Sequence, residues 1–407
     1  MINVALVSHS HHLHGAERSL LSLAELFYRK FGITLFNNNN IHPILMIPAL
    51  ENGKMASIAQ KSGYEVVYTP PNPWYIYKSP KNAQEFDIFC ESIREDTKTF
   101  INLFKEAKAD IVIVNTLTNF IPHIAAFTLN LPIISWICGV LEPAFIPEID
   151  ATYQSFIDRT IINLSSKVVM NSNWTEKRFE HITDKNNVIT IQNYAFEPSV
   201  SMPYNEAINN FICLNSFDPK KGNNILVDAV KIIKDKGIKT HVNLYGNGYE
   251  SQNLSNQISE LEINDYVSIN PPTENVSKLY NDCSALIQPS FYESFGRTNI
   301  EAMAHKRPVI AANTADPEDI VQDGKTGFHF EQGNSEELAL KMIYILNNKN
   351  KAKAMGEAGY KVYKTYFDGK VAKKKITDLI YSLYRTQTKH TLMQQYAFDT
   401  LKLVHKQ

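Results

Sequence analysis

Short runs of β-branched and aliphatic residues alternate with longer amphipathic stretches in the first half of the chain. Segments such as 110–116 (DIVIVNT) and 132–138 (PIISWIC) have the length and composition of buried strands. Residues 15–31 place apolar side chains at helical spacing. A repeated strand and helix predicts a parallel sheet with right-handed helical crossovers. The strands expected in this half are 3–8, 43–49, 65–69, 110–116, 132–138, 167–172 and 188–193.

Residues 196–210 (FEPSVSMPYNEAINN) interrupt the alternation with prolines, asparagines and no clear period, as is typical of a linker. The alternation then restarts, with helices expected over 222–236 and from about 297, and three lysine-rich helices between about 334 and 390. The strands expected in this half are 211–216, 241–246, 266–270, 285–290, 308–313 and 327–331. The asparagine-rich residues 36–43 are expected to form a surface loop.

The pattern therefore predicts an α/β protein with two Rossmann-like domains, residues 1–200 and 205–370. Helices and a tail over 371–407 could pack back on the N-terminal domain. Open α/β sheets bind ligands beyond the carboxyl ends of their strands. We therefore expect the two sheets to face each other across a cleft that holds the ligand.

Composition adds limits on location and partners. The 407 residues include 41 basic and 42 acidic side chains, so a general nucleic-acid footprint is not supported. Four cysteines without a C-x-x-C pair favour a reduced, cytoplasmic setting. The N-terminus does not resemble a signal peptide, and no apolar run reaches the roughly 18 residues of a membrane span. Peripheral membrane contact stays open, because the lysine-rich residues 361–375 fit either an anionic surface or a solvated helix face.

Residues 290–304 (SFYESFGRTNIEAMA) carry the most specific chemistry. An apolar strand ends before this segment, so Glu293 is expected in the strand-to-helix loop and Glu301 one to two turns into the next helix. Eight residues at helical rise span roughly 12 Å at most, about the length of a sugar joined to a ribose through a diphosphate. Gly296 allows close approach of the backbone to a ligand. The free N–H groups of Arg297, Thr298 and Asn299 would point at an anion.

This segment resembles the E-x7-E signature of the retaining, family-4-type glycosyltransferases of the GT-B fold. The resemblance implies that Glu293 holds the donor sugar and Glu301 the nucleotide ribose. For E-x7-E taken alone, a pair of surface helix acids is an equal alternative. The resemblance extends from about residue 3 to 385, through GAERSL (15–20), NSFDPKKGNNILVDAV (215–230), LYGNGYE (244–250) and residues 317–342.

The resemblance implies a donor site in the second domain and an acceptor site in the first. Lys221 would stabilise the departing nucleoside diphosphate, and Glu293 and Lys221 would be the catalytic pair. The alternative for Lys221 is a surface lysine before a helix. The expected donor-binding residues are Gly15, Ser216, Lys221, Gly246, Glu293, Phe295, Gly296, Arg297, Thr298, Asn299 and Glu301. The expected acceptor residues are His14, Glu17, Trp74 and Cys138.

The chain departs from the family pattern at two positions of the site. Ser216 replaces the usual arginine five residues before Lys221, so the second phosphate clamp is missing or comes from elsewhere, with Arg297 as a candidate. Cys138 stands where the family often has histidine near the donor sugar, and an inert thiol is favoured over a nucleophile. His14 also replaces the first glycine of the family's GGAERSL loop.

Metal is not expected in the reaction. The histidines His9, His11, His12 and His14 lie in one loop without the distant ligands of a standard zinc site. The chain also has no Asp-x-Asp pair. The resemblance thus implies transfer without a required cofactor, the charge site being Lys221 and a helix N-terminus. Residues 68–80, which contain Trp74, are either an acceptor platform of stacked aromatic rings or a packed surface loop.

The resulting function is retaining transfer of a sugar from a nucleotide-sugar to a glycan or lipid-linked hydroxyl, as in bacterial cell-surface polysaccharide synthesis. One alternative is a relative that binds nucleotide-sugar or glycan as a partner subunit without catalysis. A dinucleotide oxidoreductase is disfavoured, because the loop after the first strand lacks G-x-G-x-x-G. A nucleotide-sugar epimerase has a similar architecture but a different signature. The donor base and sugar and the acceptor are not readable.

Overall fold

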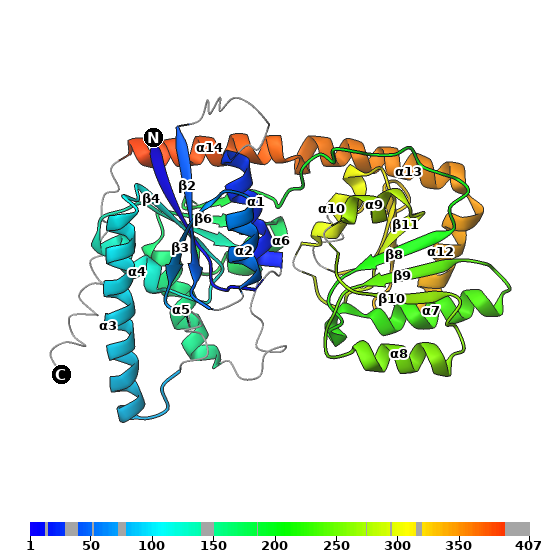
Figure 1. Ribbon diagram of the computed structural model, residues 1–407, viewed down its shortest axis with the longest axis horizontal. Coiled ribbons are helices and arrows are strands. Elements are labelled where there is room, and N and C mark those ends of the chain that lie inside the picture. Colours follow the sequence, from blue (N-terminus) through cyan, green and yellow to red (C-terminus); the bar gives the residue numbers. More distant parts are fainter. Residues whose placement is uncertain are drawn as a thin grey trace. The chain divides into compact units, whose positions relative to one another are not determined.

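The protein folds into two compact units, residues Met1–Ile191 with Lys373–Gln407, and residues Gln192–Ala372. The computed structural model describes residues 1–12, 15–28, 40–50, 53–71, 79–139, 150–184, 186–273, 275–293, 295–314 and 320–386. Figure 1 labels the elements of both units.

Unit 1 is built on a parallel sheet whose strand order is β3-β2-β1-β4-β5-β6-β7. The order reverses direction between β1 and β4, as in Rossmann-type folds, which makes this the topological switch point. The strands are β1 (Ile2–Val7), β2 (Ile41–Pro48), β3 (Glu65–Thr69), β4 (Ile111–Asn115), β5 (Ile133–Ile137), β6 (Lys167–Met170) and β7 (Val188–Thr190). The helices are α1 (Gly15–Phe27), α2 (Lys54–Lys61), α3 (Ala83–Glu106), α4 (Ile121–Thr128), α5 (Ala151–Leu164) and α6 (Asn173–Phe179).

The central strands of unit 1 are buried on both faces. Residues 4–7 of β1 are each at most 1% exposed, as expected for a parallel sheet covered by helices on two sides. Helices α3, α4, α5 and α6 contribute apolar side chains to one core with strands β1, β4, β5 and β6. Polar side chains cap three of these helices at their first turns: Asn82, Asp150 and Ser172 accept hydrogen bonds from backbone N–H groups.

Unit 2 repeats the topology with six parallel strands in the order β10-β9-β8-β11-β12-β13, so its switch point lies between β8 and β11. The strands are β8 (Asn210–Leu214), β9 (His241–Tyr245), β10 (Val267–Asn270), β11 (Ala285–Gln288), β12 (Val309–Ala312) and β13 (Gly327–Phe330). The helices are α7 (Asn223–Asp235), α8 (Ser251–Glu260), α9 (Val276–Asn281), α10 (Arg297–Ala304), α12 (Ser335–Asn347) and α13 (Lys349–Val362), with short turns η2 (Pro219–Lys221) and η3 (Tyr363–Phe367).

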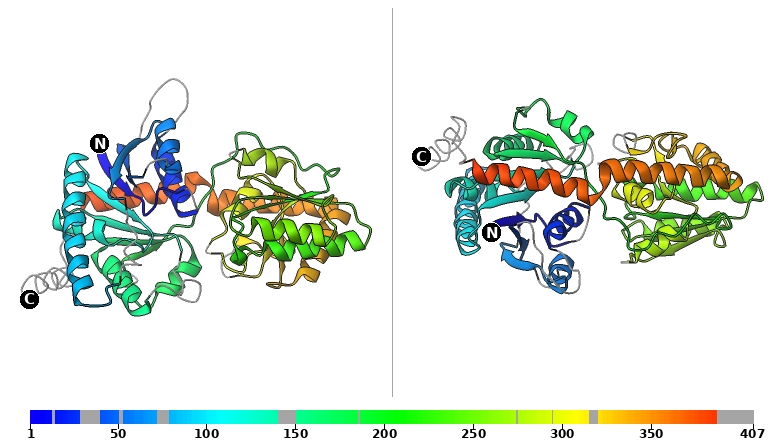
Figure 2. Two further views of the ribbon diagram at one scale, coloured as in Figure 1. Left: turned by 60° about the horizontal axis from the view of Figure 1, so that its bottom comes forward. Right: turned by 90° about the horizontal axis from the view of Figure 1, so that it is seen from above.

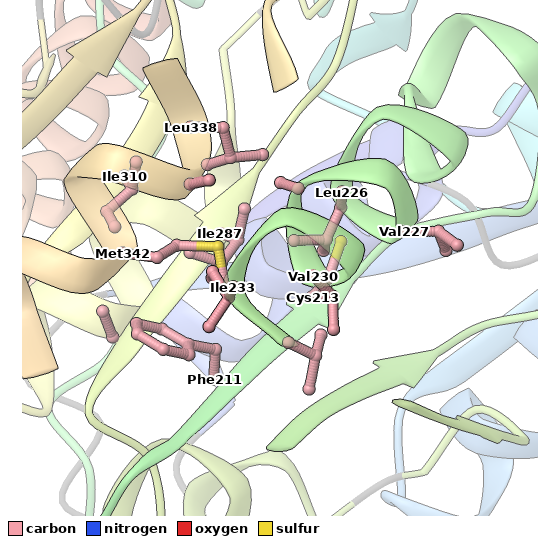
Figure 3. Close-up of a cluster of buried hydrophobic side chains, with 14 of the residues drawn as sticks. Phe211, Cys213, Leu226, Val227, Val230, Ile233, Ile287, Ile310, Leu338 and Met342 are labelled. Atoms are coloured by element: carbon pink, nitrogen blue, oxygen red, sulfur yellow. The ribbon is translucent and has the colours of Figure 1, made fainter. Parts of the chain in front are cut away.

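Two apolar cores lie on opposite faces of the second sheet, and Figure 2 shows helices on both sides of it. One core joins the strands to α7, α8 and α12. Figure 3 shows Phe211, Ile287 and Met342 among its side chains. The other core joins Tyr280, Ile300, Met303 and Tyr363 from α9, α10 and η3. The second core holds α10 in place at the sheet.

Helix α14 (Gly369–Arg385) starts in unit 2, and from Lys373 its residues belong to unit 1. Its buried side chains Ile376, Leu379, Ile380 and Leu383 have the spacing of one helix face. The Lys373 ammonium lies 5.8 Å from the centre of the Phe27 ring of α1. Unit 1 is therefore assembled from both ends of the chain.

The predicted fold class is confirmed, because both halves are Rossmann-like parallel sheets. One local expectation was wrong: residues 41–43, placed in a surface loop, begin β2 as Ile41–Pro48. These residues pair with residues 2–4 of β1, and Ile41 is fully buried. A cleft between the two sheets stays a prediction.

Candidate functional site in unit 2

The predicted donor residues of unit 2 lie on loops at the carboxyl edge of its sheet. Ser216 and Lys221 follow β8, Gly246 follows β9, and Glu293 follows β11, all on the described part of the chain. Glu301 is the fifth residue of α10. Because β8 and β11 are neighbours, the loops with Lys221 and Glu293 start at the switch point of the sheet.

Lys221 and Glu293, 72 residues apart in sequence, form an ion pair. The Lys221 Nζ donates to Glu293 Oε2 at 2.8 Å, and the two side chains are 19% and 17% exposed. Lys221 ends the short turn η2, which Asp218 caps by accepting from the Lys220 N–H. Both groups are thus partly shielded from water, which strengthens their interaction compared with a surface pair.

The backbone brings the two loops together. The Phe291 N–H donates to the Lys220 carbonyl at 2.8 Å. Gly222, with φ +64°, passes so close to the other loop that a Cβ atom would lie 2.1 Å from the Pro289 carbonyl oxygen. Only glycine accommodates both the left-handed conformation and this approach. The glycine after Lys221 therefore helps to set the position of its ammonium against Glu293.

Glu293 is ionised in this environment. Burial alone would raise the pKa of its carboxyl, but the Lys221 charge and hydrogen bond outweigh that effect. The backbone N–H groups of Gly296 and Phe295 also donate to the carboxylate, and the pKa is held below its usual range. Gln288 Nε2 donates to the same Oε2 at 2.9 Å. An ionised carboxylate only accepts hydrogen bonds, which suits it to hold hydroxyl groups.

Glu301 is held by groups of its own helix and of α9. The Tyr280 hydroxyl donates to Glu301 Oε2 at 2.9 Å, and the Arg297 Nη2 lies 3.8 Å from Glu301 Oε1. Burial first, and then the Glu301 charge, raise the pKa of Tyr280 well above its ordinary value, so the phenol stays protonated and donates. The Tyr280 ring stacks on His305 at 4.9 Å between centroids. The carboxylate is therefore fixed in orientation before any ligand binds.

The start of α10 contains unpaired polar atoms. Asn299 is fully buried, and among the described residues neither its Oδ1 nor its Nδ2 has a hydrogen-bond partner. Gln288 Oε1 is likewise unpaired within the described chain. Gly296 has φ +76°, which favours glycine, and a Cβ there would lie 2.6 Å from Asn299 Nδ2 and 2.9 Å from Gln288 Oε1, so these side chains would have to shift. Unpaired buried amides cost free energy and mark a locally unsatisfied site.

The remaining predicted donor residues occupy the same edge or the first unit. Phe295 is buried in the core beneath α10, and Thr298 accepts from the Tyr280 hydroxyl at 3.4 Å through its carbonyl. A Cβ at Gly246 would lie 2.0 Å from the Asn215 carbonyl oxygen, so this turn is closely packed. The Ser216 carbonyl accepts from Asn223 Nδ2 at 3.2 Å.

Of the predicted residues in unit 1, Gly15 opens α1, and a side chain there would meet no described heavy atom within 4 Å. Glu17 is 1% exposed and lies 3.1 Å from the His9 Nε2. This burial argues against direct contact of Glu17 with an acceptor. Cys138 is half-buried, and its Sγ lies 3.0 Å from Asn115 Oδ1. His14 and Trp74 lie outside the described residues.

Two residues of the site were missed from the sequence. Tyr280 orients Glu301, but an aromatic residue in a short helix gives no signal of that role. Gln288 is bonded to Glu293, and its polar side chain inside the apolar run ALIQPS was a usable signal.

Among the described residues, no group of three or more His, Cys, Asp or Glu side chains could hold a metal ion. Within the same residues, no helix is long and apolar enough to cross a membrane.

The loops and helices of this site fall inside a recognised family segment. Residues 203–362 match the family described as Glycosyl transferases group 1. An uncharacterized glycosyltransferase from Methanocaldococcus jannaschii is 30% identical over 208 residues, which is 50% of this chain and 56% of that protein. The capsular polysaccharide biosynthesis glycosyltransferase CapM from Staphylococcus aureus is 28% identical over 173 residues, 42% of this chain and 44% of CapM. These comparisons support the group 1 glycosyltransferase family.

The chain thus aligns with about half the length of these two relatives. The fold extends further than the sequence similarity. HepE from Anabaena, solved in complex with UDP and glucose, superposes with a TM-score of 0.76 at 18% identity, over 94% of this chain and 100% of that one. At that identity the likeness shows the GT-B fold.

Proposed function

We propose that the protein is a glycosyltransferase that moves a sugar from a nucleotide-sugar donor to a hydroxyl of a glycan or lipid-linked acceptor. The observation that carries the proposal is the ion pair of Lys221 and Glu293, 2.8 Å apart, at the switch point of unit 2. Glu293 lies eight residues before Glu301. The family match over this segment and the UDP-bound structural neighbour point to the same chemistry. A capsular polysaccharide relative favours cell-surface polysaccharide as the setting.

The two glutamates would bind hydroxyl groups of the donor, and the lysine would bind its diphosphate. Glu293, ionised and acceptor-only, holds donor sugar hydroxyls, and Glu301 holds the ribose hydroxyls. The Lys221 ammonium has three N–H donors and gives one to Glu293, so it can also donate to the diphosphate. As the glycosidic bond breaks, negative charge accumulates on the diphosphate, and a fixed cation stabilises that state more than the ground state.

We further infer a retaining, metal-independent reaction. Lys221 and the first N–H groups of α10 would supply the positive charge to the diphosphate that a divalent ion supplies in other enzymes. The Asn299 N–H, expected to be free, instead donates to the Gly296 carbonyl at 2.9 Å. By resemblance to the family, no protein carboxylate forms a covalent intermediate, and the leaving phosphate would assist deprotonation of the acceptor on the same face of the sugar. The donor-binding role belongs to the second unit and the acceptor-binding role to the first.

The decisive experiment is a thermal-shift screen of the whole protein against nucleoside diphosphates and nucleotide-sugars. A ligand that binds only the native state raises its apparent stability, by about 2.7 kcal/mol at a concentration 100 times the Kd. We expect UDP and UDP-sugars to raise the melting temperature. If no nucleotide of the panel does so, the proposed function is wrong.

A non-catalytic binding subunit is the second candidate, supported by Ser216 in place of the usual arginine. Slow hydrolysis of the donor separates the two. A transferase is expected to release nucleoside diphosphate slowly without acceptor, at a rate that falls in Lys221→Ala. A thermal shift with no release above the variant's background would favour the binding subunit.

A further inference from the structure

The side chain of Asn299, in the first turn of α10, is buried and unpaired within the described chain. Asn299 is fully buried, and neither its Oδ1 nor its Nδ2 has a hydrogen-bond partner among the described residues. Buried amides are normally paired, because an unmet donor or acceptor costs free energy. A fully buried side chain does not contact the donor itself. Any role of Asn299 in the reaction therefore acts through neighbouring residues.

The neighbour that matters is Gly296, the residue that precedes α10. The Asn299 N–H donates to the Gly296 carbonyl at 2.9 Å, and Asn299 is the third residue of the helix. In a capping box, the side chain at this position accepts from the N–H of the residue before the helix. The Asn299 amide also lies against Gly296, since a Cβ there would be 2.6 Å from Nδ2. Position and distance therefore suit Asn299 Oδ1 as an acceptor for the Gly296 N–H.

In this structure the Gly296 N–H donates to Glu293 instead. The Glu293 carboxylate accepts from the N–H groups of Gly296 and Phe295, from Lys221 Nζ and from Gln288 Nε2. A carboxylate has about four acceptor positions. These four donors therefore use its whole capacity. A sugar hydroxyl can donate to Glu293 only after one of the four donors has moved away.

The Gly296 N–H is the donor that can leave at the lowest cost. Withdrawal of Lys221 would leave a partly buried carboxylate without its counter-charge. Withdrawal of Gln288 would leave its buried amide unpaired at both ends, because its Oε1 already has no partner among the described residues. Phe295 is fixed by its packing in the apolar core. The Gly296 N–H, in contrast, has the unpaired Asn299 amide beside it as a second acceptor.

We propose that Asn299 is a positioning residue that accepts the Gly296 N–H when the donor binds, so that Glu293 can accept a hydrogen bond from the donor sugar. The proposal rests on the proposed function, because it takes the sugar as the ligand of Glu293. In the same change, Asn299 Nδ2 can donate to Gln288 Oε1, since both atoms lie against Gly296. The three unpaired atoms of these two amides thus gain partners, which offsets the bond that Glu293 gives up.

This exchange should affect binding of the sugar and not of the nucleotide. The diphosphate is assigned to Lys221, which has two N–H donors besides the one that it gives to Glu293. The ribose is assigned to Glu301, whose carboxylate is held by Tyr280. UDP alone should therefore bind without the exchange, whereas a UDP-sugar requires it.

The test is isothermal titration calorimetry of the whole protein with UDP, UDP-glucose, UDP-galactose and UDP-N-acetylglucosamine. Asn299→Leu replaces both polar atoms by methyl groups in the same branched shape, and Asn299→Ala is the smaller second variant in case leucine does not fit. For at least one UDP-sugar, the ratio of its Kd to that of UDP should rise roughly 3–10-fold in the variants, the effect of one hydrogen bond. The Kd of UDP should stay unchanged, whereas a merely structural role would weaken both ligands.

Ser290→Ala is the matched control. The Ser290 hydroxyl is also buried and unpaired among the described residues, but the atoms nearest to a Cβ at Gly296 belong to Asn299 and Gln288. Its Kd ratio should equal that of the unaltered protein. An unchanged ratio in both Asn299 variants, or a Kd of UDP that rises as much as that of the UDP-sugars, overturns the proposal alone. If neither UDP nor a UDP-sugar binds the unaltered protein, the proposed function has failed, and the proposal fails with it.

Discussion

Lys221 and Glu293 form a partly buried ion pair in which each side chain stabilises the charge of the other. Glu293 is kept ionised mainly because Lys221 offsets the cost of its burial. Lys221 is in turn held near the place where the donor diphosphate is expected. Removing either partner leaves the other partly buried without its counter-charge, so each variant should affect both ligand binding and the local structure.

Lys221→Ala and Glu293→Ala should each lower donor turnover by roughly 10²–10³-fold, because each removes an electrostatic contact to the reacting donor. Lys220→Ala is the matched control: the neighbouring lysine is 47% exposed and lies 3.5 Å from Asp218. Its turnover should stay close to that of the unaltered protein. Release of nucleoside diphosphate is the measurement, and circular dichroism checks the fold. Near-normal turnover in both site variants would refute these roles.

Asp158, on α5, is a buried carboxyl that is expected to make the stability of the protein depend on pH. Burial raises its pKa to about 7, whereas in the unfolded chain the pKa is near 3.9. The folded protein therefore keeps a proton that the unfolded chain releases, and stability falls as pH rises from about 4 to about 7. The loss is on the order of 4 kcal/mol.

Asp158→Asn should abolish that part of the pH dependence. Relative to the unaltered protein, the variant should gain stability as pH rises through this range and keep the gain above about pH 7. Urea unfolding at about pH 5 and about pH 8 is the measurement. If the variant and the unaltered protein differ in free energy of unfolding by the same amount at both pH values, Asp158 ionises normally in the folded state.

At the scale of elements, a glycine lies at each end of α7, and the two glycines have different surroundings. Gly222, before the helix, and Gly237, just after it, both have positive φ. A Cβ at Gly222 would meet the Pro289 carbonyl at 2.1 Å, whereas a Cβ at Gly237 would meet nothing described within 4 Å. The first glycine therefore serves the contact between two loops, and the second only ends a helix.

Gly222→Ala should separate the loops that bear Lys221 and Glu293, adding about 1–3 kcal/mol of overpacking to the backbone strain. It should weaken the nucleotide-induced thermal shift as well as stability. Gly237→Ala carries the strain alone, of roughly 1–2 kcal/mol, and should keep the full shift. Equal effects of the two substitutions on the shift would mean that the loop contact does not position the site.

Elements were more readable from the sequence than the details of the site. The thirteen strands of the described chain overlap the predicted apolar runs, and central strands such as β1 and β4 are buried on both faces and leave a continuous apolar signal. Glu293 and Glu301 lie in the loop and the helix that spacing predicted. The partners Tyr280 and Gln288 were not predicted, since they depend on contacts between separate segments of the chain. The burial of Glu17 against His9 is of the same kind.

At the scale of the molecule, the two units have separate apolar cores, and the residues of α14 from Lys373 onward belong to the first unit. Ile376 and Ile380 are fully buried on this helix, and Lys374 and Lys375 are exposed on it. Unit 1 should therefore depend on residues that are the farthest from its strands along the chain.

Ile376→Ala and Ile380→Ala should each destabilise unit 1 by about 2–5 kcal/mol through lost burial and a residual cavity. Hydrogen exchange should show weaker protection in β1, β4 and β5, with β8, β9 and β11 unchanged. Lys374→Ala and Lys375→Ala are the controls on the same helix and should change stability by no more than about 0.5 kcal/mol. Loss of protection confined to unit 2 would contradict the division of the chain.

The return of the chain from unit 2 to unit 1 has a consequence for biosynthesis. A ribosome delivers the polypeptide from its N-terminus, and domains generally fold as they emerge. Unit 2 is continuous and can complete its core as soon as residue 372 has left the exit tunnel. The strands of unit 1, although synthesised before unit 2, need Lys373 and the residues after it, so unit 1 is expected to become native after unit 2.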